Sequence, residues 1–388
     1  MNLSKLGESM AGQPMFEILE RAQELERSGR KIYHFELGEP DFDTPRNISK
    51  VAIEAIKSGQ THYTPSTGLY ELKKAAAEAT ERSRGFLPSM EQVLVTPGAN
   101  SIIYLAIKCV VNPGEEVIVP NPGFPTYFSA IDACGAKAVD VQLKQENGFS
   151  INPEDIKEAI SPKTRMLILN SPSNPTGGVT CQEDLVKIAE ICEKHNICLL
   201  SDEIYSRLVF SENEFYSPGS FDNCLSRTII INGFSKAFAM TGWRLGVAIG
   251  PEHVVKKMGS LVSTIVSCVP PFVQLAGVEA INGNQDEPDY IKREFEKRML
   301  LLVDGLNSLP GVICRQPKGA IYAFANITKT GMSSKEFAEF SLEKAGVALT
   351  PGHFFGSYGE GFVRLCAVQS IDIIEEALES LKRAMSSG

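Results

Sequence analysis

The sequence predicts an α/β protein built on a mostly parallel sheet that is covered by helices. Between residues 92 and 250, short apolar runs rich in β-branched residues alternate with amphipathic stretches of helical period. After residue 288, strands and helices alternate again, which indicates a second, smaller α/β domain. A chain of 388 residues is long enough to give each domain its own core.

The composition is that of an ordinary globular protein, with 43% hydrophobic and 22% charged residues. The net charge of −9 argues against nucleic acid or an anionic membrane as a main partner. There is no run of 18 apolar residues and no apolar signal-peptide core at the start, so we expect no transmembrane helix and no secretion.

The cysteines and histidines point to a reducing compartment and to no structural metal. Nine scattered cysteines without a C-x-x-C pair are typical of reduced, mostly buried thiols, so we expect a cytoplasmic protein. Five scattered histidines do not have the spacing of a zinc site, and no metal is predicted.

The first part of the chain is predicted to contain helices separated by two irregular loops. Proline, glycine and acidic residues mark a loop at 38–45, and a similar loop spans 62–68. The apolar residues of the flanking segments recur at helical spacing, and glycines close the first two. The helices are predicted at 14–29, 46–58 and 69–84.

In the alternating part, each predicted strand is followed by a residue that could take part in chemistry. The strand ends of a parallel sheet point to one edge, where open α/β sheets bind ligands, so we expect these residues to converge. The strands are predicted at 92–96, 116–119, 165–169, 197–200 and 228–231, with helices at 101–111 and 181–196. The residues after the strands are Ala99 and Asn100, Phe124, Asn174, Asp202 and Lys236.

The turn Pro97–Asn100 before a helix exposes backbone N–H groups at the positive end of the helix dipole, which is an anion site in the physical sense. It lacks the G-x-G-x-x-G spacing of a dinucleotide site and is a weak signal alone. Phe124 stands in a proline-stiffened loop, where an aromatic ring is either core or a stacking surface for a planar ligand.

Asn174 and Asp202 bring polar side chains to two strand ends. Asn174 is held extended by Pro175, and its amide can donate to a ligand oxygen or accept from it. A carboxylate at the end of a buried strand is costly unless it is paired, and a protonated pyridine nitrogen would be a fitting partner for Asp202. Tyr205 could reach the same ring. Taken alone, Asp202 is more simply interpreted as a helix N-cap.

Lys236 follows the strand at 228–231, with Ser235 beside it and Arg244 further along. Such an amine either binds phosphate as a point charge or forms a Schiff base with a carbonyl. The first use needs a G-x-x-x-x-G-K-[ST] loop, which is absent. The second fits a pyridoxal phosphate (PLP) site, with arginine and hydroxyl on the phosphate. Alone, this lysine would be interpreted as a solvated surface residue.

The C-terminal part is predicted to form the second domain. A long charged helix covers 288–308, and strands at 319–324 and 361–365 alternate with helices at 333–345 and 371–385.

Taken as an ordered set, the motifs resemble the class I/II aminotransferases of PLP fold type I, most closely the aspartate-aminotransferase-like subgroup. The resemblance runs from Gly38 to Arg364. Its most specific motifs are N-P-T-G at 174–177, S-D-E-I-Y at 201–205 and S-K-A-F-A-M-T-G-W-R-L-G at 235–246. The motifs at 38–45, 63–69 and 95–100 match in the same order.

The resemblance implies a role for each matching residue. Lys236 would hold PLP as a Schiff base, and Asp202 would pair with the pyridinium nitrogen. Asn174 and Tyr205 would bond the phenolic oxygen of the ring, and Phe124 would stack on it. Arg364 would bind the substrate α-carboxylate. The phosphate would be held by Ala99, Asn100, Ser235 and Arg244, and Gly38 and Asn174 would assist Arg364. Several relatives have serine where this chain has Gly233, which weakens one phosphate contact.

The resemblance also implies the domain division and the assembly. A large PLP-binding domain would span 41–280, with a seven-stranded type of sheet, and the small domain would combine 1–40 with 281–388. Tyr63 would reach the phosphate of the neighbouring subunit, which implies a homodimer with shared active sites.

The predicted function is transfer of the amino group of an L-amino acid to a 2-oxo acid by a ping-pong mechanism, with aspartate as the favoured donor and 2-oxoglutarate as the expected acceptor. Amino acids with aromatic or small neutral side chains remain alternative donors, because the sequence shows no second arginine that could bind the side-chain carboxylate of aspartate. A PLP-dependent carbon–sulfur lyase would use the same lysine, aspartate and arginine. A non-catalytic regulator of this fold usually carries a fused DNA-binding domain, for which this chain has neither room nor charge.

Overall fold

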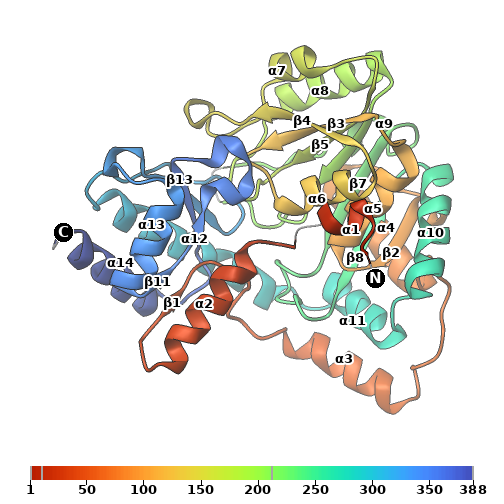
Figure 1. Cartoon of the computed structure of the whole chain (residues 1–388). Helices are drawn as coiled ribbons and strands as arrows, with labels where there is room; N and C mark the ends of the chain where they lie inside the picture. The colour runs from red at the N-terminus through yellow and green to blue at the C-terminus, as the bar shows by residue number, and fades with distance from the viewer. Residues whose placement is uncertain (1, 10–11, 211–212, 387–388) are drawn as a thin grey trace.

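The computed structural model describes residues 2–9, 12–210 and 213–386. Two sheets organise it, a large one in the middle of the chain and a smaller one near the C-terminus. In Figure 1 the C-terminal elements gather on the left, in blue, and the large sheet with its helices fills the right. The prediction of an α/β fold with a mostly parallel sheet and a smaller α/β part is confirmed.

Within the described residues, the large sheet has seven strands in the order β2-β8-β7-β6-β5-β3-β4. All neighbouring strands are parallel except at β8, which is antiparallel to both β2 and β7. The strands are β2 (Val93–Pro97), β3 (Glu116–Asn121), β4 (Lys137–Gln142), β5 (Thr164–Asn170), β6 (Cys198–Asp202), β7 (Thr228–Gly233) and β8 (Leu245–Ile249).

Helices cover both faces of this sheet, which explains why its inner strands read as unbroken apolar runs. In β7, Ile229 and Ile231 join the core under α5, α6 and α10, whereas Ile230 joins the core on the opposite face. Each isoleucine buried this way contributes about 1.5–3 kcal/mol of hydrophobic stabilisation. The helices around this sheet are α3 (Arg46–Lys57), α4 (Tyr70–Arg84), α5 (Ala99–Val110), α6 (Pro125–Ala133), α7 (Pro153–Ala159), α8 (Gln182–His195), α9 (Gly219–Asp222), α10 (Glu252–Val266) and α11 (Pro271–Asn282).

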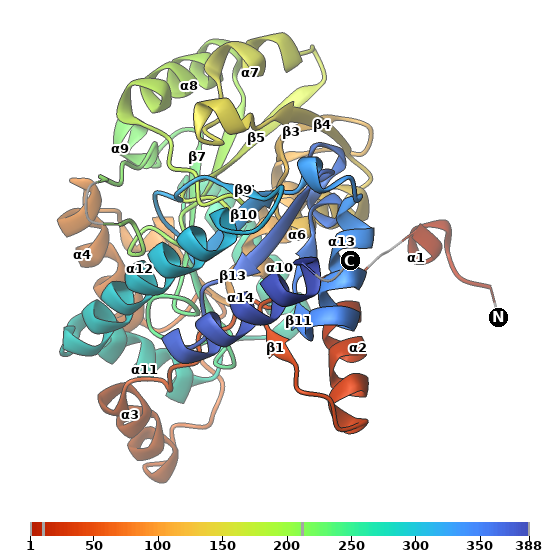
Figure 2. The ribbon, with the colours of Figure 1, turned by 90° about the vertical axis from the view of Figure 1, so that its left-hand side faces the viewer.

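The smaller sheet is antiparallel, in the order β12-β13-β10-β9, and a short parallel pair joins β1 to β11. Figure 2 shows α12 and α14 crossing one side of this sheet next to each other. The strands are β1 (Tyr33–His34), β9 (Ile313–Cys314), β10 (Tyr322–Asn326), β11 (Val347–Ala348), β12 (Thr350–Pro351) and β13 (Phe362–Cys366). The helices are α1 (Lys5–Ser9), α2 (Met15–Arg27), α12 (Asp286–Asn307), α13 (Ser334–Phe340), a π-helical turn at Ser341–Ala345, and α14 (Ile371–Ser386).

Several elements differ from the sequence prediction. Helix α5 begins at Ala99 rather than at 101, so the expected anion turn is already the first turn of the helix. The strand expected at 319–324 lies at 322–326, because Gly319 only bridges to Val209. Two strands, β4 and β8, and three helices, α6, α10 and α11, were not predicted from the sequence. The domain division at 41–280 stays a prediction.

No helix in the described part of the chain is long and apolar enough to span a membrane.

Candidate active site

A cavity of about 490 Å³ lies where the parallel strands of the large sheet end. Asp202 closes β6, Lys236 follows β7, and Arg364 reaches the same cavity from the smaller sheet. All predicted site residues but one lie on its wall, namely Gly38, Ala99, Asn100, Phe124, Asn174, Asp202, Tyr205, Ser235, Lys236, Arg244 and Arg364.

Tyr63 is the exception. Its side chain is 88% exposed, on the loop before α4, and does not line the cavity of its own chain. This placement leaves the hydroxyl available to a second subunit.

Lys236 lies at the centre of the cavity, and its Nζ donates to the carbonyl oxygen of Gly38 at 2.5 Å. Burial lowers the pKa of this amine from its usual 10.5 to about 8. The nearby cations of Arg364 and Arg244 act in the same direction, whereas Cys366 and Glu39 act against it. A lysine with such a pKa has an appreciable neutral fraction near pH 7, which a nucleophilic amine requires.

Asp202 is buried at the end of β6, and its carboxylate accepts two hydrogen bonds. The Tyr127 hydroxyl donates to Oδ2 at 2.7 Å, and the Ile204 N–H donates to Oδ1 at 3.2 Å. Burial raises the pKa of the carboxyl to about 6, and the two hydrogen bonds oppose this. Within the described ranges no cationic side chain forms an ion pair with Asp202, so a protonated ring nitrogen would complete its environment.

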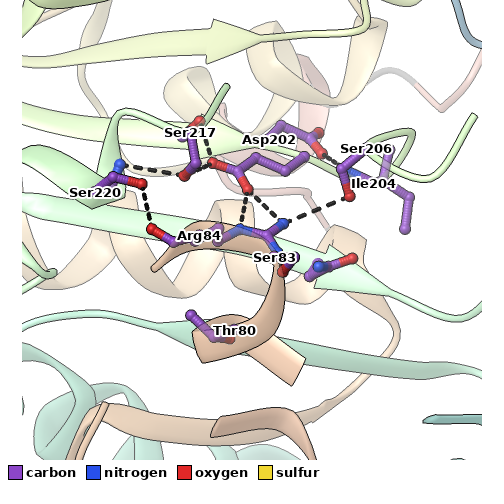
Figure 3. Close-up of polar contacts among 12 residues, drawn as sticks. Thr80, Ser83, Arg84, Asp202, Ile204, Ser206, Ser217 and Ser220 are labelled. Carbon is purple, nitrogen blue, oxygen red and sulfur yellow. Dashed lines mark hydrogen bonds and ion pairs between the residues drawn. The ribbon is translucent and has the colours of Figure 1, made fainter. Parts of the chain in front are cut away.

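The next residue, Glu203, points to the opposite face of the strand. Its carboxylate forms an ion pair with Arg84 at 2.6 Å and accepts hydrogen bonds from Ser201 at 3.1 Å and Ser217 at 2.5 Å. Figure 3 shows this network reaching from the end of α4, with Asp202 on its far side. Two adjacent carboxylates therefore differ in surroundings, since Glu203 is fully paired and Asp202 is not.

Tyr205 and Tyr322 form a buried pair beside Asp202. Their hydroxyl oxygens are 2.6 Å apart, and their rings meet edge to face. Burial raises the pKa of Tyr322 to about 12 and that of Tyr205 well above its ordinary value, so both stay protonated. One hydroxyl donates to the other, and the second keeps its proton for a ligand oxygen.

One end of the cavity gathers donors suited to a phosphate. Ala99 and Asn100 are the first residues of α5, and Ser235 and Arg244 lie beside them. Gly98, with φ of +80°, permits this approach, because a Cβ there would lie 2.6 Å from Nη2 of Arg244. The Arg244 backbone also has a positive φ, and its Nη1 donates to the Thr241 carbonyl at 2.9 Å.

The other end contains Arg364, which is only 2% exposed. Its Nη1 donates to Oδ1 of Asn174 at 3.1 Å, and its Nη2 donates to the Glu36 carbonyl at 2.6 Å. The guanidinium also lies 4.6 Å from the ring centre of Tyr322, while its Nε is buried without a hydrogen-bond partner among the described residues. In the part that the structure describes, Arg364 forms no ion pair with a carboxylate, so a ligand carboxylate would fit here.

The loop that supports this end is itself anchored by a charged pair. Oε1 of the fully buried Glu36 lies 2.8 Å from Nδ1 of His34. The hydrogen bond to Glu36 raises the pKa of His34 to about 9, so the imidazole is charged at neutral pH. This pair orients the Glu36 carbonyl that accepts from both Arg364 and Thr350.

Sequence reasoning missed Tyr127, Tyr322 and Glu36. A signal for Tyr127 was present, because it stands three residues after Phe124 on the first turn of α6 and therefore near the same strand end. Tyr322 and Glu36 have no local signal, since they reach the site only through the packing of the smaller sheet.

The arrangement places the half-buried amine of Lys236 between an end suited to phosphate and an end suited to carboxylate. A carboxyl that lacks a cationic partner and a tyrosine pair line the space between them. These groups fit PLP, whose aldehyde, phosphate, ring nitrogen and phenolic oxygen each find a complementary residue.

Comparison with known proteins agrees with this geometry. A family model described as aminotransferase class I and II matches residues 30–381. The chain is 40% identical to an aspartate aminotransferase of Pyrococcus horikoshii over 371 residues, which covers 95% of this chain and 93% of the relative. It is 39% identical to aromatic-amino-acid aminotransferase 2 of Thermococcus litoralis over 352 residues, which covers 90% of each. The solved aspartate aminotransferase from Thermus thermophilus with maleate has a TM-score of 0.95 and 34% identity, covering 99% of this chain and 100% of that chain.

Proposed function

This chain belongs to the class I and II aminotransferases, PLP-dependent transaminases of fold type I, and on that premise we propose that it transfers the amino group of L-aspartate to 2-oxoglutarate. The observation that supports a transaminase most directly is the half-buried amine of Lys236, which lies between a phosphate-type set of donors and Arg364. The fold, the enzyme class and the cofactor that the sequence predicted are confirmed.

The residues that would hold the cofactor are those at the strand ends of the large sheet. Ala99, Asn100, Ser235 and Arg244 would bind its phosphate. Asp202 would bind the ring nitrogen, Asn174 and Tyr205 would donate to the phenolic oxygen, and Phe124 would stack on the ring. When bound, PLP supplies an electron sink for the substrate α-carbon.

The residues at the other end orient the amino acid. Arg364 binds the α-carboxylate with two parallel hydrogen bonds, and the contact with Asn174 fixes the plane of the guanidinium. Lys236, released from its contact with Gly38, takes up the α-proton at Nζ and later returns a proton from the same atom. Because one cavity serves donor and acceptor in turn, the oxo acid product leaves before the second substrate enters, which gives ping-pong kinetics.

The choice of aspartate as donor rests on the relatives, of which the one from Pyrococcus horikoshii is an aspartate aminotransferase at 40% identity. A specific observation favours aromatic donors as the second candidate. Apart from Arg244, Arg364 and Lys236, the described residues of the wall include no cation, and Met15, Phe16 and Leu37 add apolar surface. A distal carboxylate would therefore need a cation from elsewhere, such as a second subunit.

The near-visible absorption of the holoenzyme, recorded before and after single amino acids are added without an oxo acid, tests both candidates. Loss of the lysine-linked PLP band with aspartate or glutamate supports the proposed donor. Loss of this band only with phenylalanine, tyrosine or alanine would show that the donor is an aromatic or small neutral amino acid and that the enzyme is still a transaminase. A persistent band with accumulating pyruvate would indicate a lyase instead.

We also propose that the enzyme works as a homodimer. Tyr63 is 88% exposed beside the cavity-bearing domain, and in this proposal its hydroxyl donates to the phosphate bound by the partner subunit. A cytoplasmic location is part of the same proposal, because all nine cysteines lie in the described part of the chain and all are free thiols.

A further inference from the structure

A second cavity, of about 360 Å³, lies behind the wall of the active site. It opens between the C-terminal part of α4 and the segments that follow β6 and β7. Its inner surface is apolar, with the aromatic rings of Phe215, Phe234 and Phe238 and the aliphatic side chains of Val247 and Ile281. None of these residues takes part in the proposed reaction.

The charged side chains that line this cavity are all basic. Three arginines line it, Arg82, Arg84 and Arg207, and among the residues with described positions no aspartate or glutamate does. Such a wall is unusual in a chain with a net charge of −9. Arg84 is neutralised from behind by Glu203 at 2.6 Å, whereas neither Arg82 nor Arg207 forms an ion pair with a described carboxylate. Two positive charges are therefore left for a ligand.

Arg207 is held in place by neutral groups. Its Nη2 donates to Oε1 of Gln285 at 2.8 Å, and its guanidinium carbon lies 4.9 Å from the ring centre of Phe238. These contacts fix the guanidinium at the cavity. Burial lowers its pKa, and Asp289 acts against this from a distance and raises the pKa, but Asp289 forms no ion pair with it within the described ranges. Asn232, on the same wall, accepts a hydrogen bond from Gly233 through Oδ1 and keeps its amide N–H groups available.

We propose that this cavity binds a small organic carboxylate with an aromatic body. The ring would lie on the apolar surface formed by Phe215, Phe234 and Phe238, and the carboxylate would receive hydrogen bonds from Arg207, with Arg82 adding positive potential. The volume suits one molecule of this size and leaves no room for a peptide or a nucleotide chain.

This site shares its wall with the active site. Ile204 lines both cavities, and it directly follows Asp202 and Glu203. Gly233 and Phe234 line the second cavity, while the next two residues, Ser235 and Lys236, line the first. The wall is thin and tightly packed, because a Cβ on Gly233 would lie 2.8 Å from Cδ1 of Ile204. A ligand in the second cavity therefore touches the segment that positions the catalytic amine.

The test is calorimetric titration of the holoenzyme with 2-naphthoate, an aromatic carboxylate without an amino or oxo group to react. Because 2-naphthoate could also occupy the carboxylate end of the active site, the titration is made in the Arg364→Ala background. We expect one molecule bound per chain. Adding Arg207→Gln should weaken binding about tenfold, the loss expected for a hydrogen bond to a charged group. Ala79→Trp, which fills the cavity from α4, should abolish binding.

Arg293→Gln, on the exposed face of α12, is the matched control and should leave the affinity unchanged. Arg207 is exposed, and Arg207→Gln removes only its contacts with Gln285 and the Phe238 ring, so it tests the site even if Ala79→Trp folds poorly. Absence of 2-naphthoate binding in the Arg364→Ala background would overturn the proposal. Binding that is equally strong with Arg207→Gln or Ala79→Trp would overturn it as well, because the ligand would then lie elsewhere.

Discussion

The two ends of the active-site cavity each present one arginine, but they are constructed in opposite ways. Arg244 is exposed, and its contacts stay within the large sheet, with Thr241 three residues away and with the turn at Gly98, which the pairing of β2 with β8 brings beside it. Arg364 is buried, and its partners Glu36 and Asn174 lie 328 and 190 residues away in the chain. A phosphate end made of neighbouring strand ends is set by the large sheet alone, whereas the carboxylate end exists only once two regions pack together.

The largest effect is expected from removing Lys236, the residue that lies between the two ends and serves both. Lys236→Ala should lower turnover by more than about 10,000-fold, because both the amine that holds the cofactor and the group that moves the proton are lost. Steady-state rates and the near-visible PLP spectrum measure this. Lys137→Ala, an exposed lysine of β4, is the control and should be fully active. Substantial turnover in Lys236→Ala would sink the assignment.

A change beside the cofactor ring, between the two ends, should act on the rate and not on substrate binding. Asp202→Asn keeps the shape but removes the charge that a protonated ring nitrogen needs, so kcat should fall roughly 100- to 10,000-fold. The KM for the amino acid should change little, since Asp202 does not touch the carboxylate end. A raised KM with normal kcat would contradict the separation of the two ends.

A change at the carboxylate end should weaken substrate binding and leave cofactor binding unchanged. Arg364→Lys replaces a planar fork by a point charge and should lower kcat/KM about 10- to 100-fold, mainly through KM. The spectrum of bound PLP and the affinity for PLP should stay as in the wild type. Arg293→Lys serves as control. Weakened PLP binding in Arg364→Lys would show that the two ends are not independent.

The pKa of Lys236 depends on both ends, because its amine lies between the cations of Arg244 and Arg364. With a pKa lowered from 10.5 to about 8, the amine is mostly protonated below pH 8 and mostly neutral above it. The rate at which apoenzyme captures PLP should therefore rise about tenfold per pH unit below pH 8 and level off above it. Stopped-flow absorption measures this rate. A rise that continues to pH 10 would mean that burial does not perturb the amine.

The smallest effect is expected at Tyr127, whose hydroxyl lowers the pKa of Asp202 by donating to Oδ2. In Tyr127→Phe this pKa should rise above about 6, so the carboxylate is protonated at a higher pH. In a plot of PLP affinity against pH, the acid limb should move upward by about one pH unit, which corresponds to a loss of at most about 1.4 kcal/mol. An unmoved limb would show that Tyr127 only packs against Asp202.

The fold could be predicted where local pattern and packing agree. The central strands are apolar on both faces, so their runs were recognisable without alternation. Strand β4 was missed because K-A-V-D-V-Q is largely exposed at the sheet edge and carries little apolar signal. Strand β8 was missed because its first two residues belong to the motif at 235–246, which hides the start of a short buried run. Its antiparallel direction depends on pairing with β2 and β7, which no local sequence encodes.

The site residues also divide into those that local sequence predicts and those that depend on long-range packing. Ala99, Asp202 and Lys236 could be predicted because each follows a strand of one parallel sheet, so topology alone brings them together. Arg364 was found only through family resemblance. Its neighbours Tyr322 and Glu36 were not found at all, because their position depends on β10 pairing with β13 and on a carbonyl contact across 328 residues.

The alternation of Asp202 and Glu203 at the end of β6 has a consequence for how this gene can change. Successive side chains of a strand face opposite sides, so deleting a single codon upstream within β6 would exchange the two carboxylates. Asp202 would then face Arg84, and the longer Glu203 would enter the cavity. We therefore expect point substitutions among the apolar residues of β6 to be tolerated far more often than any in-frame deletion of one residue.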